Sequence, residues 1–261
     1  MLKAENISFR IGEKILVDKT SLSFEQHRFH VIMGANGAGK STLLKLLAGS
    51  QHPSGGKIFL DEKELKHFTK KELATHRAVL SQHYNITFPI TTTDIVLMGR
   101  YPHYYTTPSH HDLDICTQVM LLMKIEDLAD RDYNTLSEGE AQKAQMSRVL
   151  AQIWEANKGE EKILFLDEPV SHLDLKYQNQ LLQVAKNLCK QNVTVIAILH
   201  DINLALGFAD RILFMKQGAI RFETGDANAV TPLIIREIFD VEANIFYPEN
   251  GQLPIVSIKR S

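Results

Sequence analysis

The sequence predicts an α/β fold, in which helices cover a largely parallel β-sheet. An apolar stretch at 29–33 runs into a glycine-rich loop and then a helix, and predicted strands and helices alternate from residue 163 onward. The chain has 261 residues, of which 44% are hydrophobic, which suffices for one large domain with a sizeable core.

The first part of the chain is rich in predicted strands. Short stretches with strand character at 2–9, 21–24 and 29–33 precede the glycine-rich loop, and a further one at 56–60 ends in a turn at Asp61. We therefore expect a β-rich start.

Residues 34–42, GANGAGKST, match the phosphate-binding pattern G-x-x-x-x-G-K-[ST] between a buried strand and a predicted helix at 41–48. In such a loop, backbone N–H groups and the positive helix end converge on an anion, a lysine reaches the β- and γ-phosphates, and the next hydroxyl binds Mg²⁺. The pattern predicts a nucleoside triphosphate site; an ordinary glycine-rich turn is the alternative. The candidate nucleotide-binding residues are Asn36, Gly37, Ala38, Gly39, Lys40, Ser41 and Thr42.

The character of the chain changes after Gln82. Stretches at 93–98, 112–123 and 142–154 carry apolar residues at helical spacing, which predicts a helical insert of about 70 residues. Beyond it, we expect strands at 163–166, 194–199, 211–215 and 220–223, helices at 176–190 and 202–209, and a small closing element made of a helix at 231–239 and the stretch 254–258.

Two acidic residues end the apolar strand 163–166. Ligands of a parallel sheet gather at the carboxyl ends of its strands, so Asp167 and Glu168 are expected beside the phosphate-binding loop. Asp167 then suits Mg²⁺, and Glu168 suits the positioning or deprotonation of an attacking water. A merely solvated acidic pair is the alternative.

His200 follows the second buried strand, 194–199. Because parallel strands end at one sheet edge, its imidazole is expected near the two carboxylates, within reach of a γ-phosphate or the attacking water. A lone histidine at a strand end is more often structural than catalytic, so both interpretations stay open.

Ser137 and Glu140 form a Ser-x-x-Glu capping box at the start of the predicted helix that contains 142–154. One interpretation is simply a well-capped helix. The other is a second helix terminus that faces phosphate, which the phosphate loop of the same chain cannot use and which therefore requires a second copy of the protein.

Composition argues against several functions. A net charge of −2 without a basic stripe predicts that nucleic acid is not a partner. Cys116 and Cys189 lack the spacing of metal ligands and are expected to be buried or semi-buried thiols in a reducing cytosol, with a disulfide as the alternative. No apolar run approaches the roughly 20 residues of a membrane span, so any link to a membrane is expected to pass through another chain.

The chain resembles the ATP-binding subunits of ABC transporters over essentially its whole length, with six motifs in the family's order. These are the loop 34–42 as Walker A, Gln82 as the glutamine loop, 136–140 as the signature motif, 163–168 as Walker B, 171–174 as the D-loop and His200 as the switch histidine.

The resemblance implies a single ABC ATPase domain, 1–261. It would combine a P-loop NTPase (RecA-like) core at 1–82 and 156–225, an antiparallel β subdomain, an α-helical signature subdomain at 83–155 and a C-terminal closing element at 226–261.

The resemblance also implies a head-to-tail homodimer that closes on two ATP molecules and reopens on hydrolysis. Each ATP would lie between one subunit's Walker A loop and Ser137 and Gly139 of the other subunit, and Asp174 would reach across the interface.

The resemblance assigns catalysis to three residues. Glu168 would be the catalytic base, while His200 and Gln82 would sense the γ-phosphate and the water or Mg²⁺. The implied metal ligands are Ser41, Asp167 and Gln82.

Two positions depart from the family's pattern. Glu138 stands where glycine is usual, near a polyphosphate that repels its carboxylate unless the side chain points away. Ile11, one residue before Gly12, stands where a tyrosine usually stacks on adenine, so apolar contact by Ile11 would replace ring stacking.

The stretch 91–103 resembles the ATPases of importers for iron-siderophores, haem and vitamin B12, in which it docks a membrane subunit. The linker 150–162 is similar to that of the haem-import members. The resemblance therefore implies two integral membrane permease subunits, contacted through 91–105, and a periplasmic binding protein reached indirectly. It also implies a peripheral location on the cytoplasmic face of the bacterial inner membrane.

Other hypotheses remain open at the level of sequence. The cargo could be a ferric siderophore or vitamin B12, and the chain could be a soluble ABC-type ATPase without a membrane partner. Glu138 and Ile11 motivate a third, a nucleotide switch that does not hydrolyse ATP. His103, His110 and His111 suggest haem ligands, although a solvated interface loop is the simpler explanation.

Overall fold

The computed structural model describes residues 1–81, 86–155, 161–171, 173–248 and 252–259. A six-stranded sheet in the order β10-β9-β3-β8-β7-β6 lies at its centre. Its strands are β3 (Phe29–Met33), β6 (Arg77–Leu80), β7 (Lys162–Asp167), β8 (Val193–Ile198), β9 (Arg211–Lys216) and β10 (Ala219–Thr224). All neighbours are parallel except β9 and β10, which form an antiparallel hairpin at the edge. The expected α/β fold is confirmed. The sequence did not predict strand β6 or the antiparallel pairing of β9 and β10.

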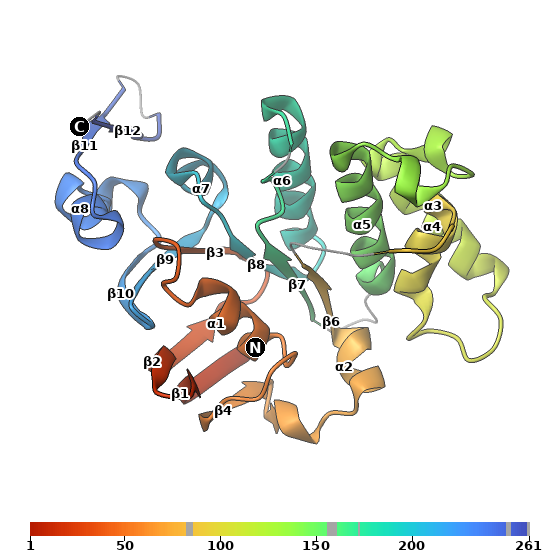
Figure 1. Cartoon of the computed structure of the whole chain (residues 1–261), viewed down its shortest axis with the longest axis horizontal. Helices are drawn as coiled ribbons and strands as arrows, with labels where there is room; N and C mark the ends of the chain where they lie inside the picture. The colour runs from red at the N-terminus through yellow and green to blue at the C-terminus, as the bar shows by residue number, and fades with distance from the viewer. Residues whose placement is uncertain (82–85, 156–160, 172, 249–251, 260–261) are drawn as a thin grey trace.

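The two faces of this sheet bury different clusters of apolar side chains. Along β3, Val31 belongs to the cluster that includes helices α6 (Leu175–Cys189) and α7 (Ile202–Phe208), while Ile32 belongs to the cluster around α1 (Lys40–Leu47). β3, β7 and β8 are buried along their whole length because they have strand neighbours on both sides and helices on both faces. Figure 1 shows α6 and α7 on one side of the sheet and α1 on the other.

A second, antiparallel sheet of four strands in the order β2-β1-β4-β5 packs beneath α1 (Figure 1). It contains β1 (Leu2–Ile11), β2 (Lys14–Phe24), β4 (Gly55–Leu60) and β5 (Lys63–Glu64). The predicted stretch 21–24 is therefore the end of a longer strand. The β-rich start is confirmed, but it is divided between two sheets, because the stretch 29–33 is β3 of the central sheet.

The helices between β5 and β7 extend the molecule beyond the β6 edge (Figure 1). They are α2 (Lys70–His76), α3 (Thr92–Leu97), α4 (His110–Met123) and α5 (Glu138–Ile153), with short 3-10 turns η1 (Leu65–His67), η2 (Met98–Arg100), η3 (Glu126–Leu128) and η4 (Tyr133–Thr135). Capping boxes at Thr69, Ser109 and Ser137 begin α2, α4 and α5. Helix α5 thus begins at Glu138, whereas the apolar periodicity of the sequence predicted a helical stretch from residue 142.

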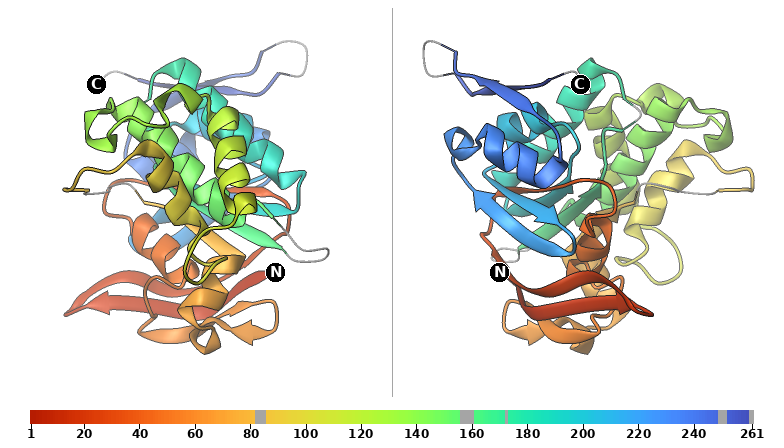
Figure 2. Two further views of the ribbon diagram at one scale, coloured as in Figure 1. Left: turned by 90° about the vertical axis from the view of Figure 1, so that its right-hand side faces the viewer. Right: turned by 60° about the vertical axis from the view of Figure 1, so that its left-hand side comes forward.

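The C-terminal part consists of η5 (Ala227–Ala229), α8 (Pro232–Phe239) and a hairpin of β11 (Ala243–Phe246) and β12 (Ile255–Ile258). The Asn203 side chain of α7 holds the hairpin, accepting from the N–H of Val256 at 2.8 Å and donating to its carbonyl at 3.0 Å. In both views of Figure 2, the hairpin and the antiparallel sheet lie at opposite ends of the molecule.

Both cysteines are free and buried, as expected. Among the residues that the structure describes, no helix is long and apolar enough to cross a membrane.

Replacing Gly99 by alanine should destabilise the packing of η2 on α5. A Cβ at Gly99 would lie 2.0 Å from the backbone carbonyl oxygen of Arg148, so η2 would have to move away from α5. Overpacking of this kind costs about 1–3 kcal/mol, which urea unfolding should detect.

Gly207→Ala in α7 is the matched control, because a Cβ at Gly207 meets nothing within 4 Å. Alanine should stabilise the protein there by about 0.5–1 kcal/mol through its higher helix propensity. Equal unfolding free energies for the wild type and Gly99→Ala would contradict the close packing.

Candidate active site

The phosphate loop connects β3 to α1 through a space that admits only backbone. A Cβ at Gly34 would lie 2.1 Å from the carbonyl oxygen of Met215 in β9, and one at Gly39 would lie 2.1 Å from that of Leu16 in β2. Gly39 also has a φ of 104°, which side chains rarely allow. The loop is therefore held between the two sheets, while Asn36 at its tip stays exposed.

Lys40 is buried, with 6% of its surface exposed, although it carries a charge. Its Nζ donates hydrogen bonds to the carbonyl oxygens of Gly34 at 2.9 Å and Ala35 at 3.1 Å. Burial lowers the pKa of the ammonium group, and the carboxylates of Glu168 and Asp167 oppose this shift. The cation is thus positioned under the loop by the loop's own backbone.

Ser41 and Asp167 bring two oxygen ligands together. The Ser41 Oγ donates to Asp167 Oδ1 at 3.1 Å, and Asp167 is 6% exposed. Burial raises the pKa of Asp167, an effect to which the nearby Glu168 adds and which the bond from Ser41 opposes. A hydroxyl beside a carboxylate is the kind of ligand pair that Mg²⁺ prefers, so these residues fit a metal bound with a nucleotide.

Glu168 lies beside His200, with 2.7 Å between Glu168 Oε1 and His200 Nε2. Glu168 has a φ of 52°, an unusual left-handed conformation for a residue other than glycine. This turn directs consecutive carboxylates to different partners, Asp167 to Ser41 and Glu168 to His200. The structure therefore brings together the acidic pair, the histidine and the phosphate loop at one sheet edge.

The N-terminus of α5 has the predicted capping box. The backbone N–H of Ser137 donates to Glu140 Oε2 at 2.8 Å, and the Ser137 Oγ accepts from the N–H of Glu140. At Gly139, a Cβ would make only an ordinary contact of 3.6 Å with Leu173 Cδ2. The described packing of this chain therefore does not require a glycine at this exposed helix end.

Gln142 connects this helix to the acidic strand end, since its Nε2 donates to the Pro169 carbonyl at 2.8 Å. The sequence did not single out this residue. Its place two residues after the signature motif was the available signal, but no periodicity argument could identify its partner.

The other predicted residues are more dispersed. Ile11 lies at the end of β1 with 63% of its surface exposed, and Glu138 is also exposed. Asp174 caps α6 by accepting from the N–H of Tyr177 at 2.9 Å. Thr42 is half-buried in the first turn of α1. Gln82 lies outside the described residues.

Two of the three histidines in the 103–111 segment, His103 and His111, have partners in the chain. His103 Nε2 is 2.8 Å from the Gln152 carbonyl oxygen, and His111 Nε2 is 2.5 Å from Glu155 Oε1. Within the described ranges, no group of three or more histidine, cysteine, aspartate or glutamate side chains is arranged to hold a metal ion.

Comparison with known proteins identifies one family. The family model described as ABC transporter matches residues 17–171. The hemin import ATP-binding protein HmuV of Nitrobacter winogradskyi is 41% identical over 253 residues, covering 96% of this chain and 92% of the relative. Its namesake from Methylobacillus flagellatus is 35% identical over 261 residues, covering 100% and 97%.

Two solved structures are similar to this chain. An inward-facing conformation of a metal-chelate type ABC transporter has a TM-score of 0.82 and 26% identity, covering 99% of this chain and 97% of that one. The dimeric, post-hydrolysis ATP-binding cassette MJ0796, bound to ADP and Pi, has a TM-score of 0.74 and 25% identity, covering 86% and 98%.

Asp167→Asn should raise the thermal unfolding temperature of the protein without nucleotide at neutral pH. The folded-state pKa of Asp167 is raised, so ionising it destabilises the fold once the pH exceeds the unfolded value of about 3.9. Asparagine avoids this cost and can still accept from Ser41. The gain should vanish below about pH 4, where the wild-type carboxyl is protonated in both states.

Asp210→Asn is the control of opposite sign. Burial alone would raise the pKa of Asp210, but hydrogen bonds from Lys186 and the N–H of Phe29 outweigh it and lower the pKa. Its ionised form therefore stabilises the fold above the unfolded pKa, and the variant should unfold at a lower temperature at neutral pH. A lower unfolding temperature for Asp167→Asn as well would refute the account of Asp167.

Proposed function

The chain belongs to the ABC transporter family as an ATP-binding, ATP-hydrolysing subunit, and from this premise we propose that it drives the import of haem across the bacterial inner membrane. Haem as the cargo is supported by one observation: the chain is 35–41% identical, over nearly its whole length, to proteins named for hemin import. No residue of this chain needs to contact the cargo, because a membrane subunit would carry it.

We assign the chemistry to groups gathered at the sheet edge. Glu168 orients and deprotonates the attacking water, and His200, 2.7 Å from it, holds the carboxylate in place and faces the γ-phosphate. Lys40 and the loop N–H groups stabilise charge on the transferred phosphoryl group. Ser41 and Asp167, with Gln82, would hold Mg²⁺, which when bound neutralises phosphate charge.

We further propose that the site is completed by a second copy of the chain. Ser137 and Glu138 at the N-terminus of α5 are exposed and Gly139 is half-buried, and the packing of their own chain does not explain the glycine. The similarity to a dimeric cassette bound to ADP and Pi supports a head-to-tail pair in which Ser137 and Gly139 close over the partner's phosphate loop. The helical part, 83–155, and the core, 1–82 with 156–225, would then supply opposite halves of each site.

The membrane partner would dock on 91–105. Tyr101 and Tyr105 are 58% and 91% exposed there, and aromatic side chains of this kind are enriched at interfaces. Two permease subunits would bind the ATPase dimer at the cytoplasmic face of the membrane, and a periplasmic binding protein would deliver the cargo.

A ferric chelate is the second candidate cargo, favoured by the similarity to a metal-chelate type transporter. A switch that does not hydrolyse ATP is disfavoured, because the groups to which we assign hydrolysis lie together, with Glu168 2.7 Å from His200 and Ser41 3.1 Å from Asp167.

Glu168→Gln should reduce ATP hydrolysis by roughly 10²–10⁴-fold, because glutamine cannot accept the proton of the attacking water. ATP binding should persist, so that an ATP-bound dimer accumulates. Phosphate release and size-exclusion chromatography with Mg²⁺ and ATP measure the two effects. Glu242→Gln, an exposed carboxylate paired with Arg236, is the control and should hydrolyse ATP normally. Unchanged hydrolysis in Glu168→Gln would refute the role of Glu168.

The import role predicts that a polytopic membrane subunit co-purifies with this chain from native detergent extracts. Vesicles that contain the purified complex should accumulate haem in an ATP-dependent manner, with ferric siderophore and cobalamin as competing cargoes. Preferential uptake of either competitor would overturn haem as the cargo. Failure to recover any membrane subunit would favour the soluble ATPase instead.

A further inference from the structure

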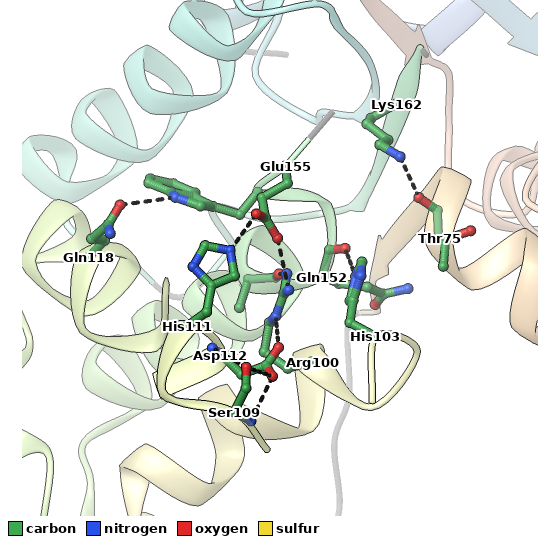
Figure 3. A network of polar contacts seen from close by, with 12 residues as sticks. Thr75, Arg100, His103, Ser109, His111, Asp112, Gln118, Gln152, Glu155 and Lys162 are labelled. Carbon is green, nitrogen blue, oxygen red and sulfur yellow. Dashed lines mark hydrogen bonds and ion pairs between the residues drawn. The ribbon is translucent and has the colours of Figure 1, made fainter. Parts of the chain in front are cut away.

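Arg100 is a buried cation with three acceptors on different segments. It ends η2, is 2% exposed, and donates from Nε to Asp112 Oδ1, from Nη1 to the Ala151 carbonyl and from Nη2 to Glu155 Oε2, each at 2.9 Å. Figure 3 shows the guanidinium between the start of α4 and the end of α5. One side chain therefore closes the segment 98–112 onto the last turn of α5.

The two acidic partners are themselves held in place. Burial alone would raise the pKa of Asp112, but hydrogen bonds from Ser109 and Arg100 outweigh it and lower the pKa to about 2. Glu155 also contacts His111 at 2.5 Å. Buried ion pairs contribute little net stability compared with apolar packing, so what this arrangement supplies is a defined geometry.

The last turn of α5 also contacts the core. Gln152 Nε2 donates to the carbonyls of Ala74 at 2.8 Å and Arg77 at 2.9 Å, at the end of α2 and the start of β6. The Gln152 carbonyl oxygen is 2.8 Å from His103 Nε2 (Figure 3). This turn is therefore the place where the segment 98–112 meets the core.

The other end of α5 is connected, through Arg131, to the start of α3, the helix that precedes the segment 98–112. The N–H of Thr92 donates to the Arg131 carbonyl at 2.9 Å, and the Arg131 guanidinium donates to the Thr135 carbonyl at 2.9 Å and to Glu140 at 3.4 Å. Glu140 belongs to the capping box of Ser137. The 16 residues of α5 span about 24 Å, so contacts at its two ends fix the orientation of the helix.

The exposed face of the segment lies directly beside Arg100. Tyr101 follows it in sequence and is 58% exposed, and its ring packs edge-on against Tyr104 with 5.8 Å between centroids. A partner that presses on Tyr101 therefore acts one residue away from the buried guanidinium.

We propose that Arg100 is a positioning residue that makes 98–112 and α5 one rigid unit, so that contact with a membrane subunit at 101–105 moves Ser137 and Gly139. The proposal rests on the proposed function and specifies how docking regulates ATP hydrolysis. Lysine cannot replace Arg100, because a single ammonium on a flexible stem does not serve three separate acceptors in fixed directions.

The test compares Arg100→Lys with the wild type and with Arg211→Lys. Arg211 is the matched control, because it also bonds both a backbone carbonyl and a carboxylate, those of Ser23 and Glu223, but outside this region. ATP turnover is measured for the detached chain and for the complex with the membrane subunit. In Arg100→Lys, the ATP turnover of the detached chain should stay within about twofold of the wild type, and the factor by which the membrane subunit stimulates turnover should fall at least fivefold. In Arg211→Lys, both quantities should match the wild type.

Glu155→Gln provides a second variant if Arg100→Lys does not fold. The Glu155 side chain is 44% exposed, and after its replacement the buried Arg100 still pairs with Asp112. It should lose part of the stimulation. Hydrogen exchange of the detached chain adds an independent readout, in which both variants should exchange faster at 98–112 than the wild type.

Three outcomes would overturn the proposal: unchanged stimulation in both variants, a proportional loss of detached and stimulated turnover, or unchanged exchange at 98–112. The first two outcomes apply only where the membrane subunit stimulates the ATP turnover of the wild type. A wild type without stimulation by any membrane subunit would refute the proposed function instead, and the exchange experiment would still decide whether Arg100 holds the segment rigid.

Discussion

The close passage of the phosphate loop between two sheets is the constraint on which the rest of the site depends. Gly34 lies against the backbone of β9 and Gly39 against that of β2, at separations that exclude any side chain. The N–H of Gly218 also donates to the Ala38 carbonyl at 2.9 Å. Close packing and hydrogen bonds within the chain therefore hold the loop in shape, and the helix that follows begins in a fixed direction.

This rigid loop explains how opposite charges coexist at a buried edge. Burial lowers the pKa of Lys40 and raises that of Asp167, and each of these charges offsets the shift of the other. Neither group would keep its charge as readily alone. The left-handed turn at Glu168 then separates the two neighbouring carboxylates, so that one faces Ser41 and the other His200. The site is prepared for a polyphosphate by the fold itself.

Helix α5 relates this site to the molecular surface. Its first turn carries the signature residues, Gln142 reaches the Pro169 carbonyl beside the acidic strand end, and its last turn receives Arg100. The first residue of α3, Thr92, bonds to Arg131, whose guanidinium reaches Glu140 in the first turn of the helix. The proposed docking segment and the helix end proposed to face phosphate are thereby connected through one helix, as regulation of ATP hydrolysis by docking would require.

The sequence by itself determined whatever depends on local pattern. The loop at 34–42, the buried strands before Asp167 and His200, and the cap at Ser137 could be predicted because residue spacing decides turns, strand burial and helix ends. Which distant residues meet could be read only from the folded chain. It showed that β6 joins the sheet edge, that Asp174 caps its own helix, and that Arg100 is buried between Asp112, Ala151 and Glu155. Those contacts depend on how elements far apart in the chain pack, and no local spacing encodes them.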